Sequence, residues 1–152
     1  MAITQAIANA FKKQLLEGDQ NFKSSGGDVF KLALYTSSAT LNSATTAYAT
    51  NPGGGANTEV ANTGTYTAGG DPLAGQNTSI ASGVAIVDFA DLSFTGVTLT
   101  ARGALIYNTS SAVTNAAVAV LNFGADKTAT SGTFTIQFPA FTTAAAILRI
   151  SG

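Results

Sequence analysis

Asp88 and Asp91, within Val87-Asp88-Phe89-Ala90-Asp91, form a closely spaced acidic pair in the sequence. Two carboxylates held about 5–10 Å apart could act as the acid and the base of a glycan-degrading enzyme, and carboxylate oxygens could also bind calcium. Neither chemistry is specific to this pair, because calcium loops need more oxygen ligands and the chain has no tryptophan to form a sugar platform. A polar turn, in which an aspartate accepts hydrogen bonds from nearby backbone N–H groups, is the favoured interpretation.

Other catalytic chemistry is limited by composition, because the chain contains no cysteine and no histidine. This excludes disulfides, zinc sites with nitrogen or sulfur ligands, cysteine nucleophiles and histidine bases. The stretch Pro52-Gly53-Gly54-Gly55 is not a phosphate-binding loop, since no GxxxxGK[ST] pattern occurs. The sequence therefore predicts a protein that is not an enzyme, with no catalytic, cofactor-binding or metal-binding residues.

The charge content is low: 10% of the residues are charged and the net charge is −1, against about 25% charged residues in typical domains. The basic residues are scattered, so no stripe exists to bind nucleic-acid phosphates. No apolar run reaches the roughly 20 residues that cross a membrane. A free monomer with so few charges is weakly protected against association, whereas an assembled subunit needs less protection. The composition thus favours self-association, with a lightly charged extracellular monomer as the alternative, and predicts neither a nucleic-acid nor a membrane partner.

Arg102 is the one basic residue whose position suggests a specific contact. It directly precedes an apolar segment, in Thr100-Ala101-Arg102-Gly103-Ala104. Its planar guanidinium could bind a carboxylate at an interface or within a sheet; the candidates are Asp88, Asp91 and Asp126. An exposed arginine at the start of a strand is the equally weighted alternative.

An amphipathic helix is predicted over residues 4–16, at the start of a single domain spanning residues 1–152. Apolar residues recur there at spacings of three and four. The stripe consists of Ile3, Ile7, Ala10, Phe11 and Leu15. Thr4 can cap the start of this helix, and Gly18 can end it in a left-handed conformation.

Strands are predicted for most of the remaining chain. Residues 29–36 alternate apolar and other side chains, which indicates a half-buried strand. Residues 83–152 form the main strand-rich region together with this segment. Its predicted strands are 84–89, 92–94, 97–99, 104–107, 118–123, 133–138 and 145–150, with a turn or bulge at Gly96 and a polar turn over 124–132. Short strands with frequent turn signals predict a mainly β fold, an antiparallel β-sandwich or barrel-like domain.

Residues 37–82 differ from their surroundings. They are rich in glycine, threonine and alanine and contain few large aliphatic side chains. Such a segment cannot bury enough apolar surface to form a core alone. We therefore expect a long surface excursion, which is either functional or disordered until bound.

Four motifs occur in a characteristic order: FKKQLLEG at residues 11–18, LALYTSSATL at 32–41, ARGALIYN at 101–108 and GTFTIQFP at 132–139. The series resembles a family of small virion proteins of tailed phages, cyanophages among them. The resemblance covers nearly the whole chain, although residues 44–62 are longer and richer in glycine than the family pattern.

The resemblance implies a viral structural protein, namely a capsid cement or decoration subunit. Such a protein would be made in the host bacterial cytoplasm and located on the phage head. It would form a homotrimer and bind the major capsid protein, stabilising contacts between capsomers. A neck, tail or fibre-associated protein or a host-surface adhesin is the alternative.

Candidate interface residues follow from the helix, the excursion and the arginine. They are Ile3, Ile7, Phe11, Tyr48, Tyr66 and Arg102. The three helix residues would serve as contacts if the helix docked outward, and core packing is the alternative for them. The two tyrosines could equally be core or plain loop residues.

Overall fold

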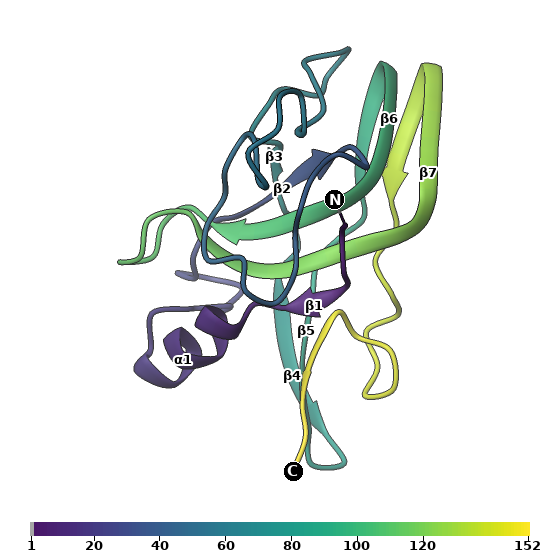
Figure 1. Cartoon of the computed structure of the whole chain (residues 1–152). Coiled ribbons are helices and arrows are strands. Elements are labelled where there is room, and N and C mark those ends of the chain that lie inside the picture. The colour runs from purple at the N-terminus through teal and green to yellow at the C-terminus, as the bar shows by residue number, and fades with distance from the viewer. Residues whose placement is uncertain (1) are drawn as a thin grey trace.

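The structure is a computed structural model that describes residues 2–152. It is mainly β, with two antiparallel sheets and one short N-terminal helix (Figure 1). The elements are β1 (Ala6–Ile7), α1 (Asn9–Glu17), β2 (Phe30–Tyr35), β3 (Asp71–Pro72), β4 (Asn77–Ala81), β5 (Val84–Asp88), β6 (Leu92–Asn108), β7 (Ala116–Ile136) and β8 (Leu148–Ile150). One sheet has the order β1-β7-β6-β2-β3 and the other β4-β5-β8. This confirms the predicted class, a β-sandwich-like antiparallel fold with an N-terminal helix.

Helix α1 begins at Asn9, so the prediction of a helix from residue 4 is wrong at its start. Residues Ala6–Ile7 instead pair with β7, and the Thr4 N–H donates to the Leu41 carbonyl, so Thr4 is not a cap. Apolar spacing cannot distinguish a helix from a strand over so few residues, and the open edge of β7 determines the outcome. Gly18 ends the helix as predicted, with a left-handed φ of 81°.

Strand β2 is buried on both faces, which corrects the prediction of a half-buried strand. Residues of the excursion run along its outer edge. Tyr35 bridges to Glu59, and the Val60 N–H donates to the Leu34 carbonyl at 2.9 Å. Five apolar side chains of the excursion are themselves buried: Ala39, Leu41, Val60, Tyr66 and Leu73. The excursion therefore contributes to the core, although most of its residues are exposed or half-buried, as predicted for a surface excursion.

Strands β6 and β7 each join segments that were predicted to be separate, and β7 includes the predicted polar turn over 124–132. Gly96, Gly124 and Ser131 have φ values of 62°, 78° and 45°. They lie where the β6–β7 register shifts. These residues form bulges, which bend a strand pair without ending it. Figure 1 shows the two strands turning together through a sharp bend.

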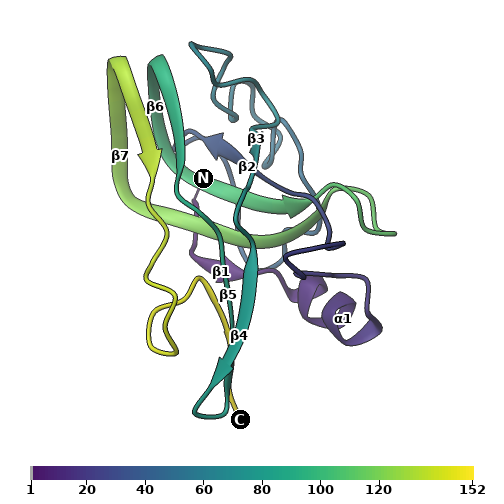
Figure 2. The same ribbon diagram turned by 180° about the vertical axis from the view of Figure 1, so that it is seen from behind.

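The β4–β5 hairpin turns through Ser82 and Gly83, whose φ values of 49° and 75° identify a type I′ turn. Strand β8 pairs with β5 on its other side. In Figures 1 and 2 this hairpin lies at the opposite end of the molecule from the bend of β6 and β7.

Phenylalanine rings connect the helix to both sheets. Phe22 stacks on Phe30 with ring centroids 4.4 Å apart, and Phe11 meets Phe22 edge-on at 5.8 Å. Phe89, just after β5, contacts Phe30 on one side and Phe138 on the other. The second sheet is therefore attached to the main core by aromatic packing rather than by strand pairing.

Candidate functional site

Three of the predicted interface residues are core residues. The side chains of Ile3, Phe11 and Tyr66 are 7%, 4% and 1% exposed. They offer almost no surface to a partner, and core packing, the alternative role considered for them, is what the structure shows. Ile7 and Tyr48 are partly buried against the same core.

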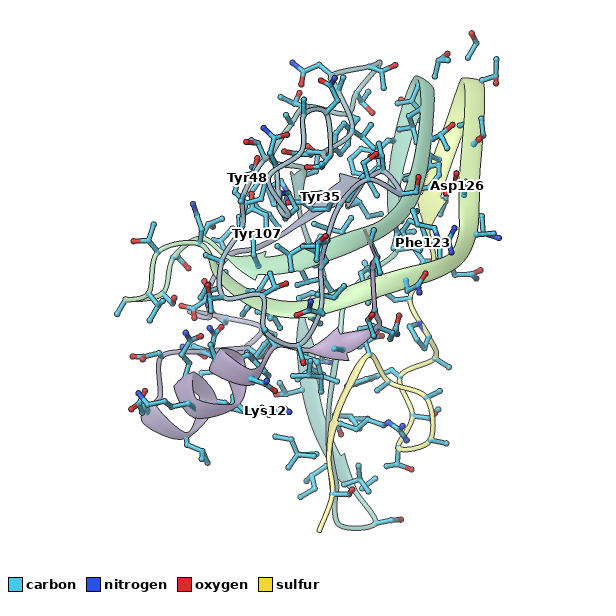
Figure 3. All side chains as sticks on the ribbon, in the orientation of Figure 1. Lys12, Tyr35, Tyr48, Tyr107, Phe123 and Asp126 are labelled. Carbon is cyan, nitrogen blue, oxygen red and sulfur yellow. The ribbon has the colours of Figure 1, made fainter. Side chains whose placement is uncertain are left out.

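Arg102 binds one of the three predicted carboxylates, that of Asp126, with the Nη1–Oδ1 distance at 3.6 Å. The two side chains are 37% and 51% exposed and lie beside the bend of β7, where Figure 3 labels Asp126. The pairing explains the position of Arg102 within this chain, without a partner.

We expect Arg102→Ala to lower the free energy of unfolding by less than about 1 kcal/mol, because partly exposed ion pairs contribute little. Urea denaturation of this variant and of Asp126→Ala measures the effect. A loss above about 2 kcal/mol in either variant would contradict an isolated surface pair.

The acidic pair does not form the predicted local turn, because Asp88 ends β5 and residues 89–91 adopt no turn. Asp91 Oδ1 instead accepts a hydrogen bond at 2.8 Å from the N–H of Phe138, which is distant in sequence. Asp88 Oδ1 is buried and has no hydrogen-bond partner among the described residues. Over residues 2–152, no group of three or more histidine, cysteine, aspartate or glutamate side chains is placed to hold a metal ion.

The most organised polar group in the structure is a cluster of all four tyrosines of the chain around Glu59, hereafter the tyrosine cluster. The tyrosines are Tyr35, Tyr48, Tyr66 and Tyr107. They come from β2, the excursion and β6. In Figure 3, Tyr35, Tyr48 and Tyr107 gather between the excursion and the main sheet.

Glu59 is the centre of this cluster, although it is only 7% exposed. Its carboxylate accepts hydrogen bonds from the Tyr48 hydroxyl at 2.8 Å, from the Tyr66 hydroxyl at 3.0 Å and from the Gly69 N–H. Three donors compensate the carboxylate for its lost hydration.

The tyrosine hydroxyls also bind backbone on both sides of the boundary between excursion and sheet. Tyr107 donates to the Gly69 carbonyl at 2.6 Å and Tyr35 to the Ala49 carbonyl at 2.8 Å. The Leu34 N–H donates to the Tyr66 hydroxyl at 2.9 Å. The cluster therefore fastens the excursion to β2 and β6.

Burial raises the pKa of all four phenols above its usual value, and the nearby charge of Glu59 raises it further. The pKa of Tyr107 rises to about 12. All four phenols are neutral at ordinary pH, and their hydrogen bonds are made within the chain. The cluster is thus suited to holding structure rather than to acid–base catalysis.

Sequence reasoning did not predict this cluster. Glu59 is one of only two charged residues in the excursion and one of only two glutamates in the chain. A lone glutamate in a tyrosine-containing segment with only one other charged residue was the available signal.

The second sheet exposes apolar side chains where the main sheet buries them. Ile80 on β4 is 72% exposed and Ile150 on β8 is 58% exposed. Both are paired with Ala85 of β5, so the three side chains form one row on the same face. All five residues of β4 are exposed. This edge is the strongest candidate for a contact surface.

The structure also contains two apolar grooves. One of about 460 Å³ lies inside the bend of β7, where Phe123 and Phe134 approach to 6.2 Å. The other, of about 290 Å³, lies between α1 and the second sheet and is lined by Phe11, Leu15 and Val87 among others.

Among residues 2–152, no helix has the length and hydrophobicity needed to cross a membrane. The chain matches no protein-family model, no curated protein and no solved structure.

Proposed function

We propose that the chain is a capsid cement or decoration subunit of a tailed-phage head. It would bind the outside of the head as a homotrimer and stabilise contacts between capsomers of the major capsid protein. The observation that carries the proposal is the exposed edge β4, with Ile80 in the open, on a chain whose charged fraction is 10%. An isolated soluble monomer normally protects such an edge.

The resemblance to small virion proteins supports the same proposal, mainly through the fold. Two of its motifs, at residues 32–41 and 101–108, overlap the paired strands β2 and β6 and are in register from Leu32↔Ile106 to Tyr35↔Gly103. The same motifs contribute Tyr35 and Tyr107 to the tyrosine cluster. The motif residues therefore coincide with those that hold the excursion on the sheet.

The physical task of a cement subunit suits this architecture. A subunit that resists outward pressure needs a stiff body and many weak contacts added over many copies. The tyrosine cluster and the phenylalanine contacts between helix and sheets supply the stiff body. The open edge and the grooves supply contact surface.

Copy number in purified particles of a phage that encodes the chain tests the proposal. We expect quantitative mass spectrometry to give a number comparable to that of the major capsid protein, because a cement subunit covers the shell. Heads and tails separated before the measurement provide the control. Only a few copies per particle, or recovery with the tails, would contradict a cement role and favour a neck, tail or fibre-associated protein.

A further inference from the structure

Strand β4 presents unpaired backbone to its surroundings. Ala81 and Val84 flank the two-residue turn, so they form a hydrogen-bonded pair, and the pairs Ser79–Ile86 and Asn77–Asp88 follow it. Thr78 and Ile80 consequently direct their backbone groups away from β5. Within residues 2–152 no strand pairs with that side of β4. The Thr78 N–H alone is occupied, by the side chain of its neighbour Asn77 at 2.9 Å.

The other sheet edges in the described part of the chain are protected. Strands β1 and β3 have two residues each. Strand β8 has three, and the Arg149 guanidinium there donates to the carbonyls of Thr143 and Ala144. The outer arm of β7 carries Asp126, Lys127 and bulges. Strand β4 has no charge, no proline and no bulge, which are the usual protections of an edge.

We propose that β4 pairs with β4 of a second copy of this chain, antiparallel, about a twofold axis through Ser79. In that register Thr78 lies opposite Ile80 of the second copy, and Ile80 lies opposite its Thr78. Both residues direct their backbone groups outward, so each pair can exchange two hydrogen bonds. The Asn77 side chain must release the Thr78 N–H for this pairing.

A second copy fits this edge for reasons of symmetry and charge. The outward groups lie one residue before and one residue after Ser79, so the strand is complementary to itself. Because β4 is uncharged, a second copy brings no like charge opposite to it. The pairing also extends the apolar row of Ile80, Ala85 and Ile150 into a face shared by two three-stranded sheets.

This inference rests on the proposed function only in its need for self-association. Two five-residue strands bury less than the roughly 1,600 Å² of a standard interface, so the contact is weak between free chains. Copies held side by side on a particle meet at a high effective concentration, which makes the same contact strong. In a trimer each copy presents one β4 edge, and these edges would connect neighbouring trimers.

Cysteine trapping tests the register, because the chain has no cysteine of its own. In Ser79→Cys the two cysteines face each other at a non-hydrogen-bonded position, where Cα atoms are about 4.5 Å apart, within disulfide range. Ala81→Cys is the matched control, exposed on the same strand and the same face. Its two copies lie four residues apart along the strands, roughly 14 Å, which is too far for a disulfide.

We expect the purified Ser79→Cys chain under mild oxidation to form disulfide dimers at least about tenfold faster than Ala81→Cys. Circular dichroism confirms that both variants are folded. Equal rates of dimer formation for the two variants would indicate random collision. Absence of a dimer from Ser79→Cys would show that the two strands do not meet in this register. Either result overturns the proposal.

A second variant tests the apolar part of the contact. Ile80→Lys placed in the Ser79→Cys chain should slow crosslinking, whereas Leu16→Lys, at a 90% exposed position on α1, should not. Equal crosslinking with and without Ile80→Lys also contradicts the proposal. These outcomes are independent of copy number, so failure of this pairing is distinguishable from failure of the cement role.

Discussion

Glu59→Ala is expected to lower the free energy of unfolding by about 3–5 kcal/mol, as removal of one partner from a buried charged network typically does. The substitution leaves the Tyr66 hydroxyl and the Gly69 N–H without their acceptor in a buried site. It also frees Tyr48, whose hydroxyl binds the other carboxylate oxygen. Urea denaturation followed by circular dichroism measures the change.

The chain supplies its own control, since Glu17 is its only other glutamate. Glu17 pairs with Lys13 on the exposed surface of α1 at 2.7 Å. Glu17→Ala should therefore change stability by less than about 0.5 kcal/mol. If Glu59→Ala is too unstable to purify, Tyr66→Phe removes one hydroxyl and should cost about 2 kcal/mol. Similar losses for the two glutamate variants would show that the tyrosine cluster does not hold the excursion.

Alkaline pH is expected to unfold the protein in one cooperative step. Each phenol has a raised pKa in the folded state, so above pH 10, the usual value for tyrosine, the unfolded chain releases protons that the folded chain retains. The stabilising contribution is therefore fully present below pH 10 and is lost as the pH rises. With four tyrosines the loss reaches up to about 5 kcal/mol for each pH unit.

Phenolate absorbance and circular dichroism, recorded together against pH, measure this transition. We expect both signals to change together well above pH 10, with all four phenols appearing at once. Tyr48→Phe removes the least buried phenol. The number of protons released in the unfolding transition should therefore fall by one, and the transition should become less steep. Phenolate formation near pH 10 with an unchanged circular dichroism spectrum would contradict buried tyrosines.

Sequence patterns within a few residues were sufficient to predict those elements whose bounds depend on neighbouring residues alone. The helix end at Gly18 and the strands at β2 and β5 follow from a left-handed glycine and from short apolar runs. Gly96 and Gly124 show the limit of this reasoning. A positive φ suits both a turn that ends a strand and a bulge within one, and only the partner strand decides between them.

The periodicity of apolar residues could not predict the tyrosine cluster, for a different reason. Its members are separated by up to 72 positions, from Tyr35 to Tyr107, and meet only when the excursion folds back on β2 and β6. A low content of aliphatic residues predicted an excursion without a core. Hydrogen bonds to one buried carboxylate, together with the few buried aliphatic side chains such as Val60, hold it in place.

The distance in sequence between these tyrosines has a consequence for the lifetime of the folded chain. We expect the cluster to form after the β2–β6 pairing, since Tyr35 and Tyr107 lie on those two strands. Interactions that form after the main barrier to folding slow the rate of unfolding and leave the rate of folding nearly unchanged. We therefore expect the tyrosine cluster to slow unfolding much more than it changes folding, a property that would suit the proposed role in a long-lived particle.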